Sequence, residues 1–517
     1  MQQSIEKPEF TDFENPNGFE ASRLTIFATT AALLTKTMTQ HSTSHRAQPI
    51  RPVRSAGQYI APFLVCMSLP LSGWTQTGEL LLNANPDRKG TVTSPGISLP
   101  LEPFRYIPPA GASRNQQALD AVKRSPEQQR ILDFNAAGNY QAAGTEGLAL
   151  MATEKLDDEL QLIVANSLAW TGRVKEAIPT YQGLGKGKYA NEANIGLANV
   201  FRWNGRDDQA VPLYRAVLAN DPENTDAIEG LELAGRELRP RTTVSVGSSS
   251  DSSDIRRRAV TLNHRWRDST GSNIMEIETS TVRDRLPTFQ ASQQDLTFRY
   301  QGLALALKPS LEISSATKTS GSVFASGQIS LFNEQLSLQA GRINWGRIAT
   351  NPNSLAANLS ALNAGLIWNQ NLAIGRLLAR ANYYDISDGN RIITSSVNLA
   401  SSWRPLGRHF KPFVGVETRD AKFNSPNYWS PAQGYGTAYA GVLAEWDGPD
   451  WGFYSSAQAG TPLYGDAGKS WNVGVGGKRW VASDIAIGFS AGALSSKRDS
   501  SVYRAKSANV SLEKLWK

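Results

Sequence analysis

Apolar and polar residues alternate with a period of two from Arg241 to the last residue, Lys517, and this pattern constrains the fold more than any other feature. Successive side chains of a β-strand point to opposite faces, so the pattern predicts strands with one apolar and one polar face. The segments are about 9 to 14 residues long, enough for a tilted strand to cross a bilayer. Nothing with helical periodicity interrupts them.

The apolar face of these segments is suited to lipid and the polar face to water. Trp471 and Val473 alternate with Asn472 and Lys478, for example, and about sixteen such segments fit into 241–517. An even number of this size is typical of a single-chain outer-membrane barrel, whose short turns and aromatic residues at strand ends also fit. A soluble propeller or sandwich would alternate too, but Arg and Glu in mid-strand and the lack of a blade repeat favour the barrel.

A helical membrane protein is excluded by the distribution of apolar residues. They make up 40% of the chain and mean hydropathy is −0.35. No run approaches the roughly twenty apolar residues that a membrane-spanning helix requires.

The N-terminal part is typical of an exported protein. An apolar run at 59–71 follows the basic residues Arg46, Arg51 and Arg54, as in a signal peptide, and Met38 precedes it at the distance expected of a start. We predict a leader and signal peptide over 1–75 and a flexible linker, rich in Pro, Gly and Asn, over 76–114.

A helical repeat is predicted over 115–240, ahead of the barrel at 241–517. The sequence Trp-x-Gly at 170–172 recurs at 203–205, and further matches lie about 33 residues apart, the period of a tetratricopeptide repeat. In such a helix hairpin a glycine turns the chain, an alanine permits close approach and a tyrosine fills the groove. The residues that define the predicted repeat, including the matching tryptophans and the proline that ends the later helix, are Trp170, Gly172, Ala177, Tyr181, Trp203, Gly205, Ala210, Tyr214 and Pro222. The stack docks a partner, guides a polymer or serves as a spacer.

Polar side chains in mid-strand are the candidates for a substrate path through a hydrated lumen. The predicted lumen-facing residues are Arg265, Arg267, Glu276, Glu278, Gln328, Arg376, Arg380, Asn382, Tyr384, Asn398 and Lys478. Lys and Arg outnumber Asp and Glu in the barrel region, which predicts a basic lumen suited to neutral or anionic polymers. Some of this excess belongs instead to loops that face lipopolysaccharide.

One local motif supports a family resemblance. The stretch 427–435 contains Tyr428, Trp429, Ser430 and Pro431, and it resembles the Tyr-aromatic-Ser-Pro-Gln motif of exopolysaccharide export porins, with Ala432 inserted before the glutamine. The order of repeat and barrel is similar to that of the cellulose synthase operon protein C family and the poly-N-acetylglucosamine export porin, although the helical part here is shorter. A group of smaller relatives resembles the chain equally well.

The resemblance implies an outer-membrane channel for an exopolysaccharide. It implies the polymer, outer-membrane lipid and lipopolysaccharide, and periplasmic or inner-membrane synthase components as partners. The alternative is a general porin or surface receptor whose repeat anchors a periplasmic partner.

Other function classes find little support in the residues. With one cysteine and four histidines, none in a metal-ligand spacing, we predict no metal and no cofactor. Neither barrel histidine, His264 or His409, accompanies a nucleophile-elbow motif, so we predict no enzyme. The net charge is +7, but the basic residues are scattered, so we predict no nucleic-acid partner.

Overall fold

The fold is described from a computed structural model. The structure describes residues 91–94, 97–100, 124–317, 323–331, 335–349, 351–372, 374–401, 409–447, 450–498 and 501–517. The predicted leader and signal peptide at 1–75 lies outside the described residues.

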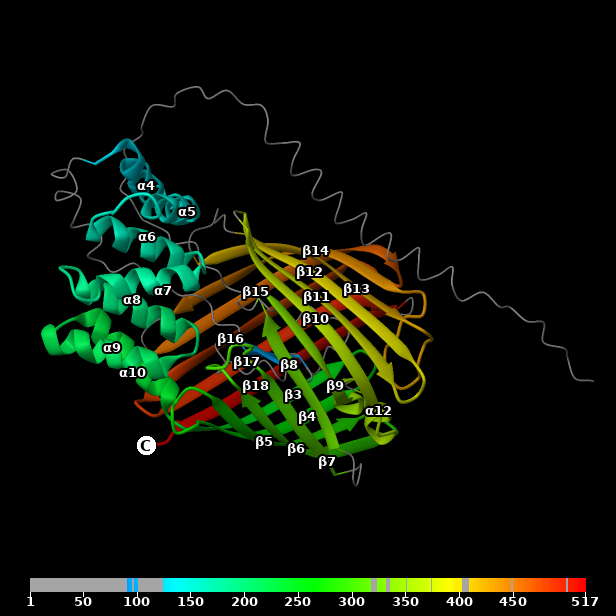
Figure 1. Ribbon diagram of the computed structural model, residues 1–517. Coiled ribbons are helices and arrows are strands. Elements are labelled where there is room, and N and C mark those ends of the chain that lie inside the picture. Colours follow the sequence, from blue (N-terminus) through cyan, green and yellow to red (C-terminus); the bar gives the residue numbers. More distant parts are fainter. Residues whose placement is uncertain are drawn as a thin grey trace, which may run out of the picture. The chain divides into compact units, whose positions relative to one another are not determined.

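Sixteen antiparallel strands close into a barrel within the described residues, and β18 pairs with β3 to complete it (Figure 1). This confirms the predicted fold class, a helical segment followed by an antiparallel barrel of about sixteen strands. The strands are β3 (Arg241–Asp251), β4 (Arg256–Arg267), β5 (Ile274–Arg285), β6 (Gln290–Gln301), β7 (Ser310–Ala316), β8 (Val323–Leu331), β9 (Leu336–Asn344), β10 (Ser360–Leu372), β11 (Gly375–Ile386), β12 (Arg391–Ser401), β13 (Phe410–Ala421), β14 (Tyr435–Asp447), β15 (Trp451–Gly465), β16 (Ser470–Ala482), β17 (Ile485–Arg498) and β18 (Ser501–Leu515).

The barrel has two rims because neighbouring strands run in opposite directions. We call the rim where β3 begins and β18 ends the proximal rim, and the opposite one the distal rim. The two longest connections, 345–359 and 422–434, belong to the distal rim.

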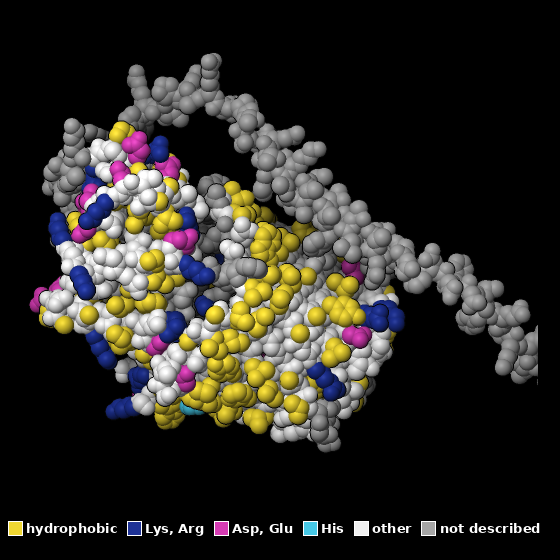
Figure 2. All heavy atoms as spheres, in the orientation of Figure 1, with side chains coloured by type: hydrophobic (Ala, Val, Ile, Leu, Met, Phe, Trp, Pro, Cys, Tyr) yellow, Lys and Arg dark blue, Asp and Glu magenta, His cyan; other side chains and the backbone are white. Residues whose placement is uncertain are grey.

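The barrel wall is apolar outside and polar inside. On β18, Ser507, Asn509 and Ser511 are buried on the inner face, whereas Val510 between them is 58% exposed. Figure 2 shows hydrophobic side chains spread over the outer wall in that view. The alternation in the sequence therefore places polar side chains inside the barrel and apolar side chains outside. This is the reverse of the usual arrangement in a protein interior.

Two short helices interrupt the strand region, contrary to the prediction that nothing helical would do so. They are α11 (Trp345–Ile348) and α12 (Pro352–Ala356), between β9 and β10. A helix of one turn is too short to produce a 3.6-residue period. The local signals for α11 and α12 are their capping side chains, Asn344 and Asn351, which accept hydrogen bonds from backbone N–H groups.

Seven helices precede the barrel in the described residues. They are α4 (Pro126–Ala136), α5 (Tyr140–Met151), α6 (Asp158–Trp170), α7 (Val174–Leu184), α8 (Ala190–Trp203), α9 (Asp207–Asn220) and α10 (Thr225–Leu238). Gly138, Gly172 and Gly205 lie between the paired helices with φ of 74°, 77° and 70°. Since this left-handed conformation favours glycine, the three hairpins turn in the same way.

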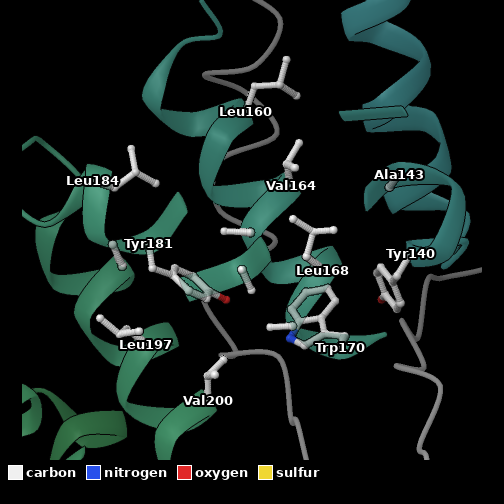
Figure 3. Close-up of a cluster of buried hydrophobic side chains, with 14 of the residues drawn as sticks. Tyr140, Ala143, Leu160, Val164, Leu168, Trp170, Tyr181, Leu184, Leu197 and Val200 are labelled. Atoms are coloured by element: carbon white, nitrogen blue, oxygen red, sulfur yellow. The ribbon is translucent and has the colours of Figure 1, made fainter. Parts of the chain in front are cut away.

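Each hairpin contributes a tyrosine to the interior of the stack. Tyr214 of α9 donates a hydrogen bond to Asn199 of α8 at 2.7 Å, and its ring lies where a side chain on Gly230 of α10 would stand. Tyr181 repeats this geometry 33 residues earlier, with Asn166 at 2.7 Å. Figure 3 shows Tyr181 among the apolar side chains of α6, α7 and α8.

A short hairpin, β1 (Thr91–Ser94) and β2 (Ile97–Pro100), lies within the segment predicted to be a flexible linker. Its second strand lies beside β7 and β8. In the part of the chain that the structure describes, no helix is long and apolar enough to cross a membrane.

Candidate functional site: the barrel lumen

A sector of the inner wall across β8 to β12 carries mainly amide side chains, and its charged members are Arg376 and Arg380 of β11. Gln339 donates to Asn363 Oδ1 at 3.2 Å and also to the side-chain oxygen of Asn382, so one amide spans three strands. Gln328 and Asn398 are buried in the same sector. The amide groups both donate and accept hydrogen bonds and carry no charge.

A second sector of amides and hydroxyls lies on β15 to β18, apart from the ion pair of Lys478 and Glu513 near the proximal rim. Gln458 is buried on the inner face, yet neither oxygen nor nitrogen of its amide has a hydrogen-bond partner among the described residues. The side-chain oxygens of Asn472, Ser490 and Ser507 are in the same position. Buried polar atoms are costly unless they form hydrogen bonds, so this wall is suited to water or to another hydroxyl-bearing molecule.

A charged sector occupies β4 to β7. Arg299 bonds to Glu276 at 2.6 Å, Glu278 at 3.0 Å and Glu312 at 2.6 Å. Nearer the distal rim, Arg257 makes two bonds of 2.7 Å to Asp284. These are ion pairs with both partners held in place, and the two-bond geometry is the strongest that an arginine forms with a carboxylate.

The connection between β9 and β10 folds into the barrel; we call 345–359 the inward segment. Arg347 on α11 bonds to Glu278 at 3.0 Å and lies 3.9 Å from Asp295, both on the inner wall. Leu355 on α12 is buried against Val282 of β5 and Ala291 of β6. The inward segment therefore narrows the lumen next to the charged sector.

Aromatic rings hold the start of the inward segment. Trp345 is fully buried between Tyr384 of β11, 5.1 Å away, and Tyr428, 5.6 Å away between ring centroids. Tyr428 also donates to Asp388 at 2.9 Å. The family-like motif at 428–431 thus lies against the inward segment at the distal end of the barrel.

The other motif residues, at 429–431, form hydrogen bonds that stabilise the connection between β13 and β14. Ser430 accepts a hydrogen bond from the backbone N–H of Ser425 at 2.6 Å, and the carbonyl of Trp429 accepts one from Arg419 at 3.2 Å. Pro431 accepts from the backbone of Ala421 at 3.2 Å. These contacts assign the motif residues a structural part in the distal connection.

All eleven predicted lumen residues lie on the inner face, but at different depths. Glu276 and Glu278 belong to the charged sector, and Gln328, Arg380, Asn382, Tyr384 and Asn398 lie on the inner face of β8, β11 and β12. Arg376 bonds to Asn369 at 2.5 Å near the proximal end. Arg265, Arg267 and Lys478 lie at the proximal rim. Their role in a substrate path stays a prediction.

Arg267 joins the barrel to the helical stack. Its guanidinium bonds to the carboxylate of Asp207 at 2.8 Å and to the carbonyl of Gly205 at 2.7 Å. Burial raises the pKa of Asp207 to about 7, even though Arg267 pulls it down. Gly205 is therefore both a turn of the repeat and an attachment point for the barrel.

Glu237 on α10 is the second attachment. Its carboxylate lies 3.2 Å from Arg241 and 3.7 Å from Arg265. Burial alone would raise the pKa of Glu237, but these arginines, with Arg267 and Lys478, outweigh burial and hold the pKa far below its usual range. Lys478 itself bonds to Glu513 at 2.9 Å.

A basic lumen stays a prediction, because some inward arginines face carboxylates whereas Arg376, Arg380 and Arg419 also point inward. The inward arginines Arg257, Arg267, Arg299 and Arg347 each face carboxylates. The exposed basic residues of the distal rim point outward instead; they are Arg256, Arg258, Arg283, Arg285, Arg504 and Lys506. Much of the excess positive charge therefore belongs to the outer wall.

Several functional residues were missed by the sequence analysis. Arg257, Arg299 and Gln458 lie at inward positions that the alternation itself marks, so the signal was available. Arg347 and Leu355 carried no such signal, because the inward segment owes its position to strands about 55 to 75 residues away. Among the described residues, no group of three His, Cys, Asp or Glu could hold a metal ion.

Comparison with known proteins gives matches in fold only. No protein-family model and no curated protein matches the chain. Among solved structures, the chain is similar to a bacterial polysaccharide outer membrane secretin, with a TM-score of 0.44 and 12% identity over 54% of this chain and 99% of the other. It is also similar to OprB of Pseudomonas putida, with a TM-score of 0.28 and 6% identity over 57% and 98%. OprD of Pseudomonas aeruginosa matches with a TM-score of 0.32 and 10% identity over 54% and 94%.

Proposed function

We propose that this protein is an outer-membrane channel that exports a polysaccharide. In this proposal the helical hairpins form a tetratricopeptide-like stack in the periplasm, where the stack docks a partner or guides the polymer.

The outer wall supports a place in lipid. Val246, Leu362 and Val510 are more than half exposed on the outer face. Exposing these apolar side chains to water costs free energy, and a lipid environment would remove that cost. The closed sheet leaves no edge with unpaired backbone groups, which is the condition for strands to cross a bilayer.

The two rims support the orientation. Outer-membrane barrels have short periplasmic turns and longer extracellular loops. Here the two longest connections, 345–359 and 422–434, are distal, and the helices join the barrel at the proximal rim. The stack then belongs to the periplasm, and a polymer would pass from the proximal to the distal rim.

The observation that carries the proposed cargo is the wall of amides and hydroxyls. Gln458, Asn472, Ser490 and Ser507 offer polar atoms that no described protein group satisfies. Sugar hydroxyls both donate and accept, so they can exchange hydrogen bonds along such a wall without one tight site. Weak contacts repeated over several strands permit sliding.

The first test is the extracellular carbohydrate of a deletion strain beside its parent and a complemented strain. Loss of one polysaccharide, restored by the wild-type gene, is the expected result. Complementation with Gln458→Leu should restore less polymer, whereas Ala457→Leu, on the outer face of the same strand, should restore it fully. Unchanged carbohydrate in the deletion strain would overturn the export function.

A general porin is the second candidate, and the charged sector favours it. Arg299, Arg347 and their carboxylates place fixed charges beside the narrowed lumen, where they would act on small ions. Planar-bilayer recordings separate the two functions: steady conductance unaffected by polysaccharide indicates a porin, and block by polysaccharide indicates an exporter.

The inward segment provides a matched pair of variants for those recordings. Leu355→Asp places a charge against Val282 and Ala291 and should release α12, so that conductance rises. Ala356→Asp changes the exposed neighbouring residue and should leave conductance as it is. Equal conductance in both variants would show that the inward segment does not limit the pore.

A further inference from the structure

Six basic side chains gather on the outer wall near the distal rim. We call them the outer basic patch: Arg256 and Arg258 of β4, Arg283 and Arg285 of β5, and Arg504 and Lys506 of β18. All six are exposed, and each alternates with residues that point into the barrel. Only the pairing of the strands brings them together, because β18 closes the barrel against β3, and β3 pairs with β4.

The register places like charges directly opposite each other. Arg256 faces Arg285, and Arg258 faces Arg283, across the ladder between β4 and β5. Opposed like charges on one face destabilise a sheet. An anion between the guanidinium groups would relieve this repulsion, because arginine forms strong charge-assisted hydrogen bonds with anionic oxygens.

No described acidic side chain forms an ion pair with the patch, although Asp254 lies in the neighbouring turn between β3 and β4. None of its six residues forms an ion pair within the described residues. Asp284 lies between Arg283 and Arg285 in the sequence but points inward to Arg257, at 2.7 Å. Asp251, on neighbouring β3, accepts from Tyr503 at 2.9 Å. The positive charge of the patch is therefore exposed on the outer wall.

The centre of the patch leaves room for a ligand. On β3, Ser250 lies between Lys506 and Arg256, and Ser248 faces Arg258. These short side chains separate the basic groups of β18 from those of β4 by two strand spacings, about 10 Å. The serine hydroxyls add hydrogen-bond donors between the charged side chains.

The patch ends where the apolar belt begins. On β4 the outward residue after Arg258 is Val260, followed by Leu262, and both are about half exposed. Two residues of a strand span about 7 Å, so the charges lie immediately beyond the belt rather than in a distant loop. A ligand that meets both regions has an anionic head and an apolar body.

We propose that the outer basic patch binds a phosphorylated sugar headgroup of a lipid in the outer leaflet of the outer membrane. Arginine binds phosphate through two parallel hydrogen bonds, and basic clusters beside an apolar surface recognise anionic lipid headgroups. The acyl chains would lie against Val260, Leu262 and Val246. This inference uses only the membrane orientation from the proposed function and is independent of what passes through the lumen.

The test measures binding of lipid A to the purified full-length protein in non-ionic detergent. The probes are lipid A with two phosphates, the same lipid after removal of both phosphates, phosphatidylglycerol and inorganic phosphate. The wild-type protein should bind the first at least about tenfold more tightly than the others, since charged hydrogen bonds to phosphate are the main interaction.

The variants replace the paired arginines. The combined variant Arg256→Gln, Arg258→Gln, Arg283→Gln and Arg285→Gln should lose about tenfold or more in affinity, and each single variant about two- to fivefold. Arg258→Lys keeps the charge but loses the two-bond geometry, so its affinity should be intermediate. The control is Arg479→Gln, which removes an exposed outward arginine near the proximal rim and should change nothing.

Each other outcome overturns the proposal. Equal binding of dephosphorylated lipid would exclude phosphate recognition, and equal binding of inorganic phosphate or phosphatidylglycerol would exclude a phosphorylated sugar lipid. An equal loss of affinity in Arg479→Gln would show that binding depends on the net charge of the protein and not on the patch. Extracellular carbohydrate, measured in the same variants, keeps the two hypotheses apart, because lipid binding can persist in a protein that exports nothing.

Discussion

The helical stack and the barrel use the same kinds of side chain in opposite places. In the stack the interior is apolar: Tyr214 is 0% exposed, and Val164 and Leu168 are buried with it. In the barrel apolar residues cover the outside, and Asn509 and Ser511 line the inside. The contrast shows that residue type alone does not decide which face of an element becomes its interior.

The few polar groups inside the stack differ from those inside the barrel. The buried tyrosine hydroxyls of α7 and α9 each have an acceptor on the preceding helix: Tyr181 has Asn166 and Tyr214 has Asn199, both at 2.7 Å. In the barrel, amides share partners or have none among the described residues, as Gln339 and Gln458 illustrate. The stack is therefore a fixed core, and the barrel interior is a surface.

The largest expected effect is on the core of the stack. Tyr214→Ala leaves a cavity between α8, α9 and α10 and should lower the free energy of unfolding of the stack by about 3–5 kcal/mol. Tyr214→Phe removes only the bond to Asn199 and should cost about 1 kcal/mol. Urea unfolding followed by amide hydrogen exchange over 190–238 measures both, and equal costs would show that the stack is not packed as a core.

The next effect concerns the outer wall of the barrel. Val510→Arg puts a charge in the middle of the apolar belt and should destabilise the barrel by about 2–4 kcal/mol in lipid vesicles. Val502→Arg, on the same face of β18 but near the distal rim, should cost only about 0–1 kcal/mol. Urea titration of the vesicle-bound protein gives both values. Equal costs would contradict a belt that is buried in lipid.

A pair of interior substitutions tests whether the interior of the barrel differs from the apolar core of the stack. Val164→Thr buries a hydroxyl in the apolar stack and should cost about 1–3 kcal/mol. Gln458→Leu removes no described protein hydrogen bond in the barrel and should change the free energy of unfolding by less than about 1 kcal/mol. If Gln458→Leu were as costly as Val164→Thr, the barrel interior would be a packed core like the stack.

A further effect is a pH dependence where the two regions meet. Burial raises the pKa of Asp207 to about 7, from 3.8 in the unfolded chain, so the folded protein binds more protons between these values. Stability of the stack should therefore fall as the pH rises from about 4 to about 7. Unfolding midpoints over this range measure the slope. Asp207→Asn should flatten it, and an unchanged slope in that variant would assign it to another group.

Prediction from the sequence succeeded where the signal was local. Alternation along β4, β11 and β16 predicted which residues point inward, including Arg380 and Asn382. The spacing of Gly172 and Gly205 matched turns that the structure places at positive φ. Both patterns depend only on backbone geometry within a few residues.

Prediction failed where distant segments meet. The inward segment owes its place to Arg347, which pairs with Glu278 on β5, and to Leu355, which packs against Val282. Arg267 was predicted to line a path, but it also holds Asp207 of the stack. The sequence alone does not show which residue a charged side chain will pair with.

The sequence by itself determined the order of helical and strand regions and the polarity of each strand face, because one period of the backbone fixes where each side chain points. Only the tertiary structure decided how those faces are used. Closure of β18 on β3 and the register of β4 on β5 gathered the outer basic patch, and the contacts of Arg347 and Leu355 with the inner wall narrowed the lumen. The physical reason is that register and closure set contacts between residues far apart in the chain, and no local pattern records them.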